Sequence, residues 1–178
     1  MNKAVEGVLY TGFPSKEELA ACPGVPTAER MAKGPVAVIE CVQRIPCNPC
    51  AGACPFGAIS IPGDITMLPE LDEDLCTGCG SCVPQCPGLA IFLVNMNYNA
   101  EEAWVEFPYE YLPLPENGME VDAVNRAGER VCPARVLGVR KKESNDGTVV
   151  IRLAVPREYA GEVRSMKPPP KKGNVDGR

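Results

Sequence analysis

The fold is decided by one stretch in the middle of the chain, Cys76-Thr77-Gly78-Cys79-Gly80-Ser81-Cys82-Val83-Pro84-Gln85-Cys86-Pro87. Its cysteines are separated by two, two and three residues. This spacing wraps the backbone tightly enough for three thiolates to reach three corners of one iron–sulfur cubane. Gly78 and Gly80 allow the close curl because glycine lacks a Cβ atom, and Pro87 turns the chain off the loop. The run predicts three ligands for one [4Fe–4S] cluster and a fourth cysteine, Cys86, that is directed elsewhere.

A second copy of this pattern lies 32 residues earlier in the chain. Seven positions keep the offset: Cys47, Cys50, Cys54, Pro55, Ala58, Ile59 and Ile61 recur as Cys79, Cys82, Cys86, Pro87, Ala90, Ile91 and Leu93. A fixed offset of this kind indicates two copies of one structural unit. We expect an apolar strand, a cysteine loop, a short turn of helix near the last cysteine and a returning apolar stretch. Residues 36–39 precede the first loop, and residues 91–94 follow the second.

The first run departs from the second at its beginning. Five residues separate Cys41 from Cys47, three more than in the complete run. We favour Cys41 as the ligand because it follows the apolar strand 36–39, much as Cys76 follows its own lead-in. Cys22 and Cys132 stay open as alternatives. Without a fourth cysteine, the first site would hold a [3Fe–4S] cluster.

Composition restricts the chemistry. The chain has ten cysteines and no histidine. The lack of histidine excludes mixed cysteine/histidine zinc sites, Rieske-type ligation and histidine acid–base catalysis. Closely spaced cysteines in a reducing cytosol indicate metal or cluster ligands rather than disulfides. Two four-cysteine zinc sites are the main alternative, although zinc ribbons usually pair two C-x2-C knuckles.

Charge and hydropathy indicate a cytoplasmic protein with protein partners. The net charge of −5 and the isoelectric point of about 4.9 disfavour binding to nucleic acid or to an anionic membrane. Residues 1–7 lead into no apolar segment of the kind found in signal peptides. No later run approaches the ~18 apolar residues of a membrane helix. We therefore expect no membrane and no nucleic-acid partner.

The segments around the repeat divide the chain into four parts. Residues 1–35 form an irregular arm in which Ser15 and Glu18 fit a capping box and Thr27 fits a second helix cap. Residues 36–98 carry the clusters. Residues 99–165 form a small antiparallel β unit, in which residues 105–111 alternate as one face of an extended segment and residues 149–155 as a half-buried strand. Residues 166–178 form a flexible tail, in which the proline-rich stretch from residue 168 onward lacks core-forming side chains. The predicted class is α+β.

Residues 36–94 resemble the dicluster bacterial ferredoxin family. The resemblance implies a ferredoxin-like α+β fold with pseudo-twofold symmetry, two [4Fe–4S] clusters and low-potential one-electron transfer. In that family the fourth cysteine of each run binds the other cluster. The ligands implied are Cys41, Cys47, Cys50 and Cys86 for cluster 1, and Cys76, Cys79, Cys82 and Cys54 for cluster 2.

The flanking segments are similar to the small iron–sulfur subunits of flavin-dependent amino-acid or amine dehydrogenases of the proline and hydroxyproline type. The similarity rests on residues 22–26, 86–92 and 107–115 and on the β unit. It implies an electron-transfer subunit whose partners are FAD-containing dehydrogenase subunits and a further iron–sulfur subunit. The alternative is a free ferredoxin that serves several redox partners. The sequence contains no Gly-rich phosphate loop and no histidine-based nucleophile, so we expect no catalytic residue in this chain.

The acidic residues Asp72, Glu73 and Asp74 directly precede the complete run. If these carboxylates lie close to cluster 2, their charge lowers its reduction potential, because reduction adds a further negative charge.

Overall fold

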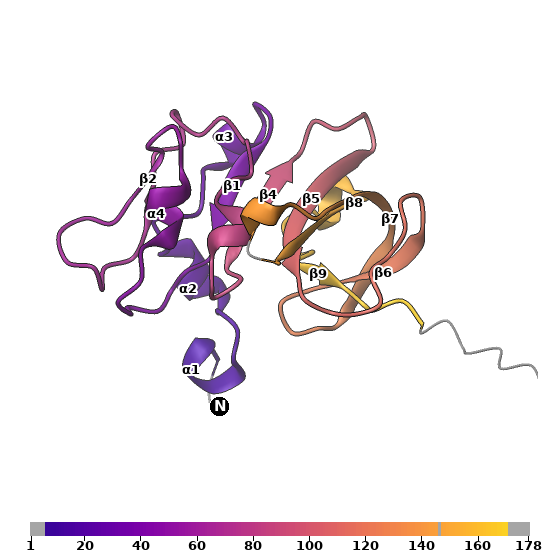
Figure 1. Cartoon of the computed structure of the whole chain (residues 1–178), viewed down its shortest axis with the longest axis horizontal. Coiled ribbons are helices and arrows are strands. Elements are labelled where there is room, and N and C mark those ends of the chain that lie inside the picture. The colour runs from indigo at the N-terminus through magenta and orange to yellow at the C-terminus, as the bar shows by residue number, and fades with distance from the viewer. Residues whose placement is uncertain (1–5, 146, 171–178) are drawn as a thin grey trace, which may run out of the picture.

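The computed structural model describes residues 6–145 and 147–170. Figure 1 shows a half made of short helices and loops beside a half made of strands. The α-helices are α1 (Val8–Thr11), α2 (Lys16–Ala20), α3 (Ala28–Met31) and α4 (Pro49–Ala53), and the 3-10 turns are η1 (Val83–Gln85), η2 (Glu143–Asn145) and η3 (Arg157–Tyr159). The strands are β1 (Val36–Ile39), β2 (Ile59–Ser60), β3 (Glu70–Leu71), β4 (Ile91–Asn95), β5 (Glu102–Tyr109), β6 (Glu120–Val124), β7 (Arg130–Arg140), β8 (Val149–Pro156) and β9 (Ser165–Met166).

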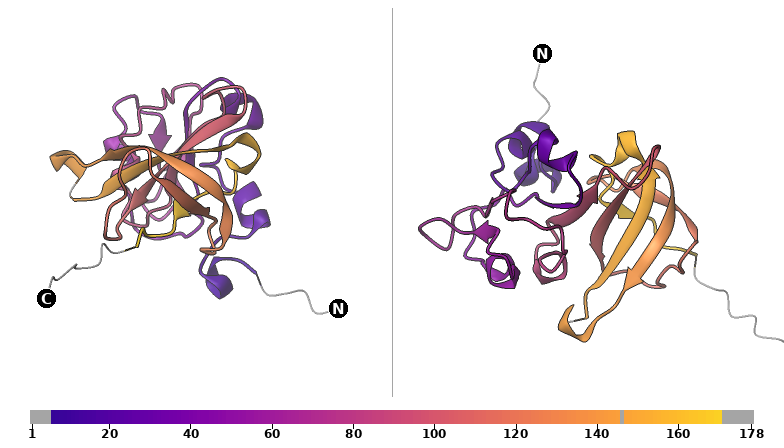
Figure 2. Two further views of the ribbon diagram at one scale, coloured as in Figure 1. Left: turned by 90° about the vertical axis from the view of Figure 1, so that its right-hand side faces the viewer. Right: turned by 90° about the horizontal axis from the view of Figure 1, so that it is seen from above.

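One antiparallel sheet runs through both halves. Its seven strands have the order β1-β4-β5-β8-β7-β6-β9, and β2 pairs separately with β3. Strand β4 pairs with β1 on one side, where Val36 faces Val94, and with β5 on the other side. Figure 2 shows this sheet twisting out of the half that carries the cysteines. The predicted domain boundary near residue 98 therefore does not divide the sheet, because β4 before it and β5 after it are hydrogen-bonded to each other.

The sheet has one apolar core on each face. Phe92 and Val94 of β4 belong to a strand core that also includes Phe107 and Ile151. The alternate β4 residues, Ile91 and Leu93, belong to a second core that contains cysteines. Because successive side chains of a strand point to opposite faces, β4 contributes to both cores. The same backbone thus anchors the cysteine loops to the β unit.

The predictions of an extended segment with one apolar face at residues 105–111 and of a half-buried strand at residues 149–155 were wrong in two respects. Trp104 and Val150 point to the cysteine core, so strands β5 and β8 are buried on both faces over much of their length. Strand β5 ends at Tyr109, and the side chain of Tyr111 is 59% exposed. The alternating pattern did not reveal the second burial because the cysteine half, which is distant in sequence, covers that face.

Residues 22–35 of the N-terminal arm fold onto the cysteine half, whereas residues 6–19 border Asn125 and Arg126 of the β unit. The Ser15–Glu18 capping box and the Thr27 cap are both present, as predicted. Arg30 donates hydrogen bonds to the backbone carbonyl oxygens of Glu73, at 2.7 Å, and Cys76, at 2.5 Å. The arm therefore positions the segment that leads into the complete cysteine run.

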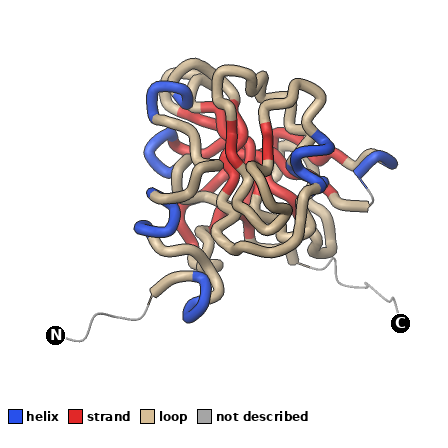
Figure 3. Tube along the Cα trace, turned by 90° about the vertical axis from the view of Figure 1, so that its left-hand side faces the viewer, coloured by secondary structure: helices blue, strands red, loops and turns tan. Residues whose placement is uncertain are grey.

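The tube in Figure 3 shows helices only at the periphery and strands in the middle. Among the described residues, no helix has both the length and the apolar character needed to cross a bilayer. The end of the predicted tail, residues 171–178, and the start of the predicted arm, residues 1–5, lie outside the described residues.

Candidate iron–sulfur site

The complete cysteine loop adopts the tight curl predicted from its glycines. Gly78 has φ +69° and Gly80 has φ +76°, a region that L-residues with a Cβ atom rarely occupy. A Cβ atom on Gly78 would lie 2.4 Å from the carbonyl oxygen of Pro35. Glycine at position 78 therefore allows the loop to pack directly against the start of β1.

Four cysteines line one hollow of the cysteine half. These residues are Cys41, Cys47, Cys50 and Cys86. Apolar side chains complete the lining, among them Ile39, Ile45, Ile61, Met67 and Ile91. We call this space the first hollow. It contains three cysteines of the first run and the last cysteine of the second.

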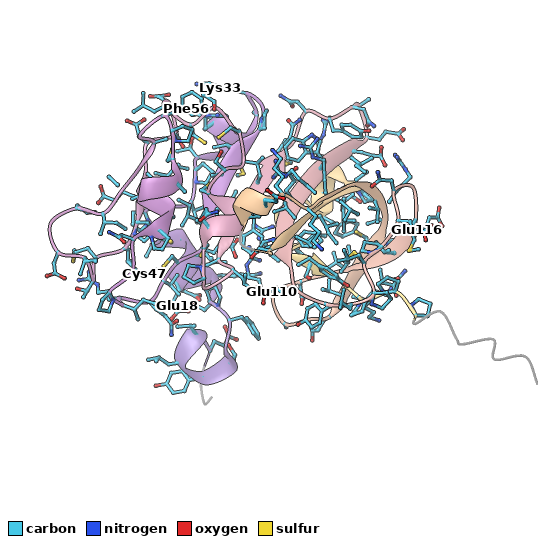
Figure 4. All side chains as sticks on the ribbon, viewed as in Figure 1. Glu18, Lys33, Cys47, Phe56, Glu110 and Glu116 are labelled. Carbon is cyan, nitrogen blue, oxygen red and sulfur yellow. The ribbon has the colours of Figure 1, made fainter. Side chains whose placement is uncertain are left out.

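A second hollow is lined by the other predicted tetrad. Its cysteines are Cys54, Cys76, Cys79 and Cys82, and its apolar walls include Ala37, Phe56, Ile59, Leu71 and Leu93. Figure 4 labels Cys47 of the first hollow and Phe56 of the second, and the two lie well apart in the cysteine half. Among the described residues, no group of three or more cysteines, aspartates or glutamates is arranged to hold a single metal ion.

Two short helical segments connect the hollows. Helix α4 contains Cys50 and is capped at its C-terminal end by Cys54, while η1 is flanked by Cys82 before it and Cys86 after it. Each segment therefore presents one cysteine to each hollow. The backbone N–H of Ala58 lies 3.3 Å from the Cys54 sulfur, and the equivalent N–H of Ala90 lies 3.4 Å from the Cys86 sulfur. The two repeats thus place the same donor beside the crossing cysteine.

The pKa values of Cys50 and Cys82 depend on burial and on the other cysteines of the same hollow. Burial, with a further contribution from Cys86, raises the pKa of Cys50 to about 11. Burial also raises the pKa of Cys82 to about 12, with contributions from Cys76, Cys79 and Cys54. Thiols with such pKa values are protonated near neutral pH, so binding of a cluster as thiolates must release protons.

A buried carboxylate lies next to each hollow and is bound by two arginines. Glu40 directly precedes Cys41 and accepts hydrogen bonds from Arg126 Nε at 2.6 Å and from Arg164 Nε at 2.8 Å. Burial alone would raise the pKa of Glu40, but the Arg126 hydrogen bonds and the two positive charges outweigh burial and lower it.

The second buried carboxylate is Glu106, which is bound by Arg140 at 3.0 Å and by Arg152 at 2.9 Å. A Cβ atom on Gly80 would lie 3.2 Å from both the Glu106 carboxylate and the Arg140 guanidinium, so this group touches the complete cysteine loop. All four arginines of the two groups belong to the β unit. This unit therefore contributes an arginine pair to the surroundings of each hollow.

Sequence reasoning missed these two groups. Glu40 and Arg164 are 124 residues apart, and Glu106 and Arg152 are 46 apart. No spacing pattern could pair them. The sequence contains one weak signal for Glu40. This glutamate lies directly after the apolar strand 36–39 and directly before a cysteine, and a buried carboxylate at such a position needs a charged or hydrogen-bonding partner.

The two remaining cysteines lie outside both hollows. The Cys22 thiol lies 3.2 Å from the Ile39 carbonyl oxygen, and Cys132 is buried in the strand core. Cys41, by contrast, lines the first hollow. The thiol set of each hollow and its apolar walls fit a [4Fe–4S] cluster, which needs four thiolates and limited access of water. That each cysteine is a ligand stays a prediction.

Comparison with known proteins supports the iron–sulfur chemistry. Residues 69–92 match the family model of the 4Fe-4S binding domain. The chain is 44% identical over 52 residues to a subunit of the ion-translocating oxidoreductase complex of Methanosarcina acetivorans, and the match covers 29% of this chain and 19% of that protein. It is 47% identical over 45 residues to a subunit of the Na(+)-translocating ferredoxin:NAD(+) oxidoreductase complex of Acetobacterium woodii, covering 25% and 13%. A probable ferredoxin of Methanosarcina thermophila is 59% identical over 27 residues, covering 15% and 47%.

These relatives indicate the class of protein, but their matches cover less than a third of the chain. The chain spans about a fifth or less of the length of the two complex subunits. No solved structure matches, so the ferredoxin-like fold of residues 36–98 stays a prediction. The domain match and the relatives show an iron–sulfur, ferredoxin-like protein that binds a 4Fe–4S cluster and has a role in electron transfer. No match shows the predicted dehydrogenase partner.

Proposed function

We propose that this chain holds two [4Fe–4S] clusters and passes single electrons between them and a partner protein. Cluster 1 occupies the first hollow and cluster 2 the second, each held by three cysteines of one run and the last cysteine of the other. The observation that carries the proposal is that two separate hollows are each lined by four cysteines in this crossed arrangement.

The chain's own residues give each cluster a defined environment. When bound, a cluster supplies reversible uptake of one electron. Apolar side chains such as Ile91 and Leu93 limit the access of water to the hollows, and the N–H groups of Ala58 and Ala90 stabilise negative charge on sulfur. Because α4 and η1 each join the two hollows, the path from one cluster to the other crosses only short stretches of backbone.

At a finer level, we propose that the chain is a subunit of a cytoplasmic heteromeric complex whose other subunits include an FAD-containing amino-acid or amine dehydrogenase. The resemblance of residues 22–26, 86–92 and 107–115 to the small subunits of such enzymes favours this partner. Two relatives are named as subunits of oxidoreductase complexes, which favours a subunit over a free carrier. The β unit also adds a large structure that cluster binding alone does not require.

The test is native purification from the source cells under anaerobic conditions, followed by size-exclusion chromatography and mass spectrometry. We expect the chain to elute in a complex with a yellow flavoprotein. A monodisperse species of 19.1 kDa without any flavoprotein would contradict the subunit assignment and favour a free ferredoxin. The iron content of the same fractions tests cluster binding separately.

A further inference from the structure

A basic hollow opens beside the second cysteine hollow. Its volume is about 510 Å³, and three segments line it: α4 with the residues around Gly52, the complete cysteine loop, and the end of β7 with the turn that follows. Figure 2, on the right, shows the orange end of β7 and β8 projecting on the same side of the molecule as the cysteine loops. This hollow therefore combines part of the cluster site with part of the β unit.

The edge of the second cluster site reaches the surface at this place. Cys79 lines both the second hollow and the basic hollow. It is exposed, whereas the other seven predicted ligands are buried or half-buried. Ser81, which contacts the Cys79 sulfur at 3.5 Å, also lines the basic hollow. A partner seated here would stand next to a cluster ligand.

The charge of the hollow is opposite to that of the whole chain. Arg140 and Lys142 line it, and no carboxylate lines it among the described residues. The chain as a whole carries a net charge of −5. The Nη2 group of Arg140 binds Glu106, while its Nε group is buried and has no hydrogen-bond partner among the described residues. Glu143, which begins η2, is not part of the lining.

We propose that this basic hollow is the docking site for an acidic surface of the electron-transfer partner. The inference rests on the proposed function, because it takes cluster 2 as the centre that exchanges electrons with the partner. A local positive field in an acidic protein orients an acidic partner, so that its redox centre faces Cys79 rather than another part of the surface. Docking of this kind weakens as salt screens the charges.

Two neighbouring lysines provide a matched test. Both lysines are exposed, but only Lys142 lines the hollow and Lys141 does not. Lys142→Glu and Lys141→Glu change the net charge by the same amount in the same segment. The measurement is the second-order rate of electron transfer from the anaerobically reduced full chain to an acidic rubredoxin, followed by stopped-flow absorbance at low and high ionic strength. A basic cytochrome c serves as the acceptor of opposite charge.

We expect Lys142→Glu to slow the reduction of rubredoxin by roughly five- to tenfold at low salt, since steering by charge commonly changes association rates by such factors or more. Lys141→Glu should slow it by less than about twofold. The difference should disappear at high salt, and cytochrome c should not be slowed by either variant.

Equal effects of the two lysine variants would overturn the docking site while leaving the proposed function intact, provided that both variants show the electron paramagnetic resonance signals of the wild type. Stronger inhibition by inorganic phosphate than by chloride at constant ionic strength would also overturn it, in favour of a small-anion site. Absence of reducible clusters from the wild type would overturn the proposed function and the docking site together.

Discussion

The two cysteine hollows have the same number of thiols, but different residues surround them. Around the first, Ile45 of the widened gap and Met67 of the loop before β3 form part of the wall, and the Cys47 N–H lies 3.3 Å from the Ile65 carbonyl oxygen. The second is formed by the uninterrupted run, and Cys79 is exposed there. The first hollow therefore has no exposed cysteine, whereas the second has one. We infer that cluster 2 faces the partner and that cluster 1 lies further along the electron path.

The largest effect is expected from Cys86→Ser, which tests the crossing between the two sites. Although Cys86 belongs to the second run, its sulfur lies in the first hollow, so cluster 1 should be lost or converted to a [3Fe–4S] form while cluster 2 remains. Electron paramagnetic resonance and iron analysis of the reduced protein measure this. The lost signal should be the one that Cys47→Ser removes, and Cys132→Ser is the control with both clusters intact. If Cys86→Ser instead matched Cys79→Ser, the crossing would be wrong.

Cys41→Ser tests the ligand at the widened gap. Cys41 lines the first hollow, whereas the nearby Cys22 does not. We expect Cys41→Ser to convert cluster 1 to a [3Fe–4S] form, visible as a resonance signal of the oxidised protein, with cluster 2 unchanged. Cys22→Ser should retain both [4Fe–4S] clusters. The reverse result would assign the fourth ligand to Cys22.

A smaller effect is expected from the two buried carboxylates. Glu40→Gln leaves Arg164, whose side chain is only 6% exposed, without its charged partner, and should reduce stability by about 3–5 kcal/mol. Glu106→Gln leaves Arg140 and Arg152, which are 30% and 40% exposed, and should cost about 1–2 kcal/mol. The measurement is the guanidinium midpoint followed by far-ultraviolet circular dichroism without oxygen. If the two variants lost the same amount of stability, the two arginine groups would not differ in burial in the way that the structure shows.

The smallest effect is expected from Asp72→Asn, Glu73→Gln and Asp74→Asn combined. Removing three negative charges near the complete run should raise the potential of cluster 2, and leave that of cluster 1 nearly unchanged. The carboxylate of Glu73 accepts hydrogen bonds from Thr27 at 2.7 and 2.8 Å at the protein surface, where water and salt screen it. We expect an upward shift of about 20 mV for one electron. A redox titration in which cluster 1 shifts more than cluster 2 would exclude this placement.

Local chemistry made much of the molecule predictable from its sequence. The Ser15 capping box, the Thr27 cap and the strand at residues 36–39 depend on neighbouring residues, and all are present. The same is true of the positive φ of Gly78 and Gly80, which the short intervals between cysteines require. The 32-residue offset also identified which residues would occupy equivalent positions.

Long-range packing could not be predicted in the same way. Burial of Trp104 on the cysteine side of β5 depends on a half of the chain that ends before β5 begins. The arginines that bind Glu40 lie near β6 and β9, at the opposite end of the sheet from β1, whereas those that bind Glu106 come from β8, the strand paired with β5, and from β7. An arginine in a β strand looks like a solvated surface residue unless the strand that faces it is known.

The most direct test of the central claim is the cofactor content of the wild-type chain purified without oxygen. We predict about eight iron and eight inorganic sulfide per chain, as two [4Fe–4S] clusters contain, broad visible absorption, and two interacting resonance signals on full reduction. About four iron per chain with one resonance signal, or stoichiometric zinc without visible absorption, would contradict the account.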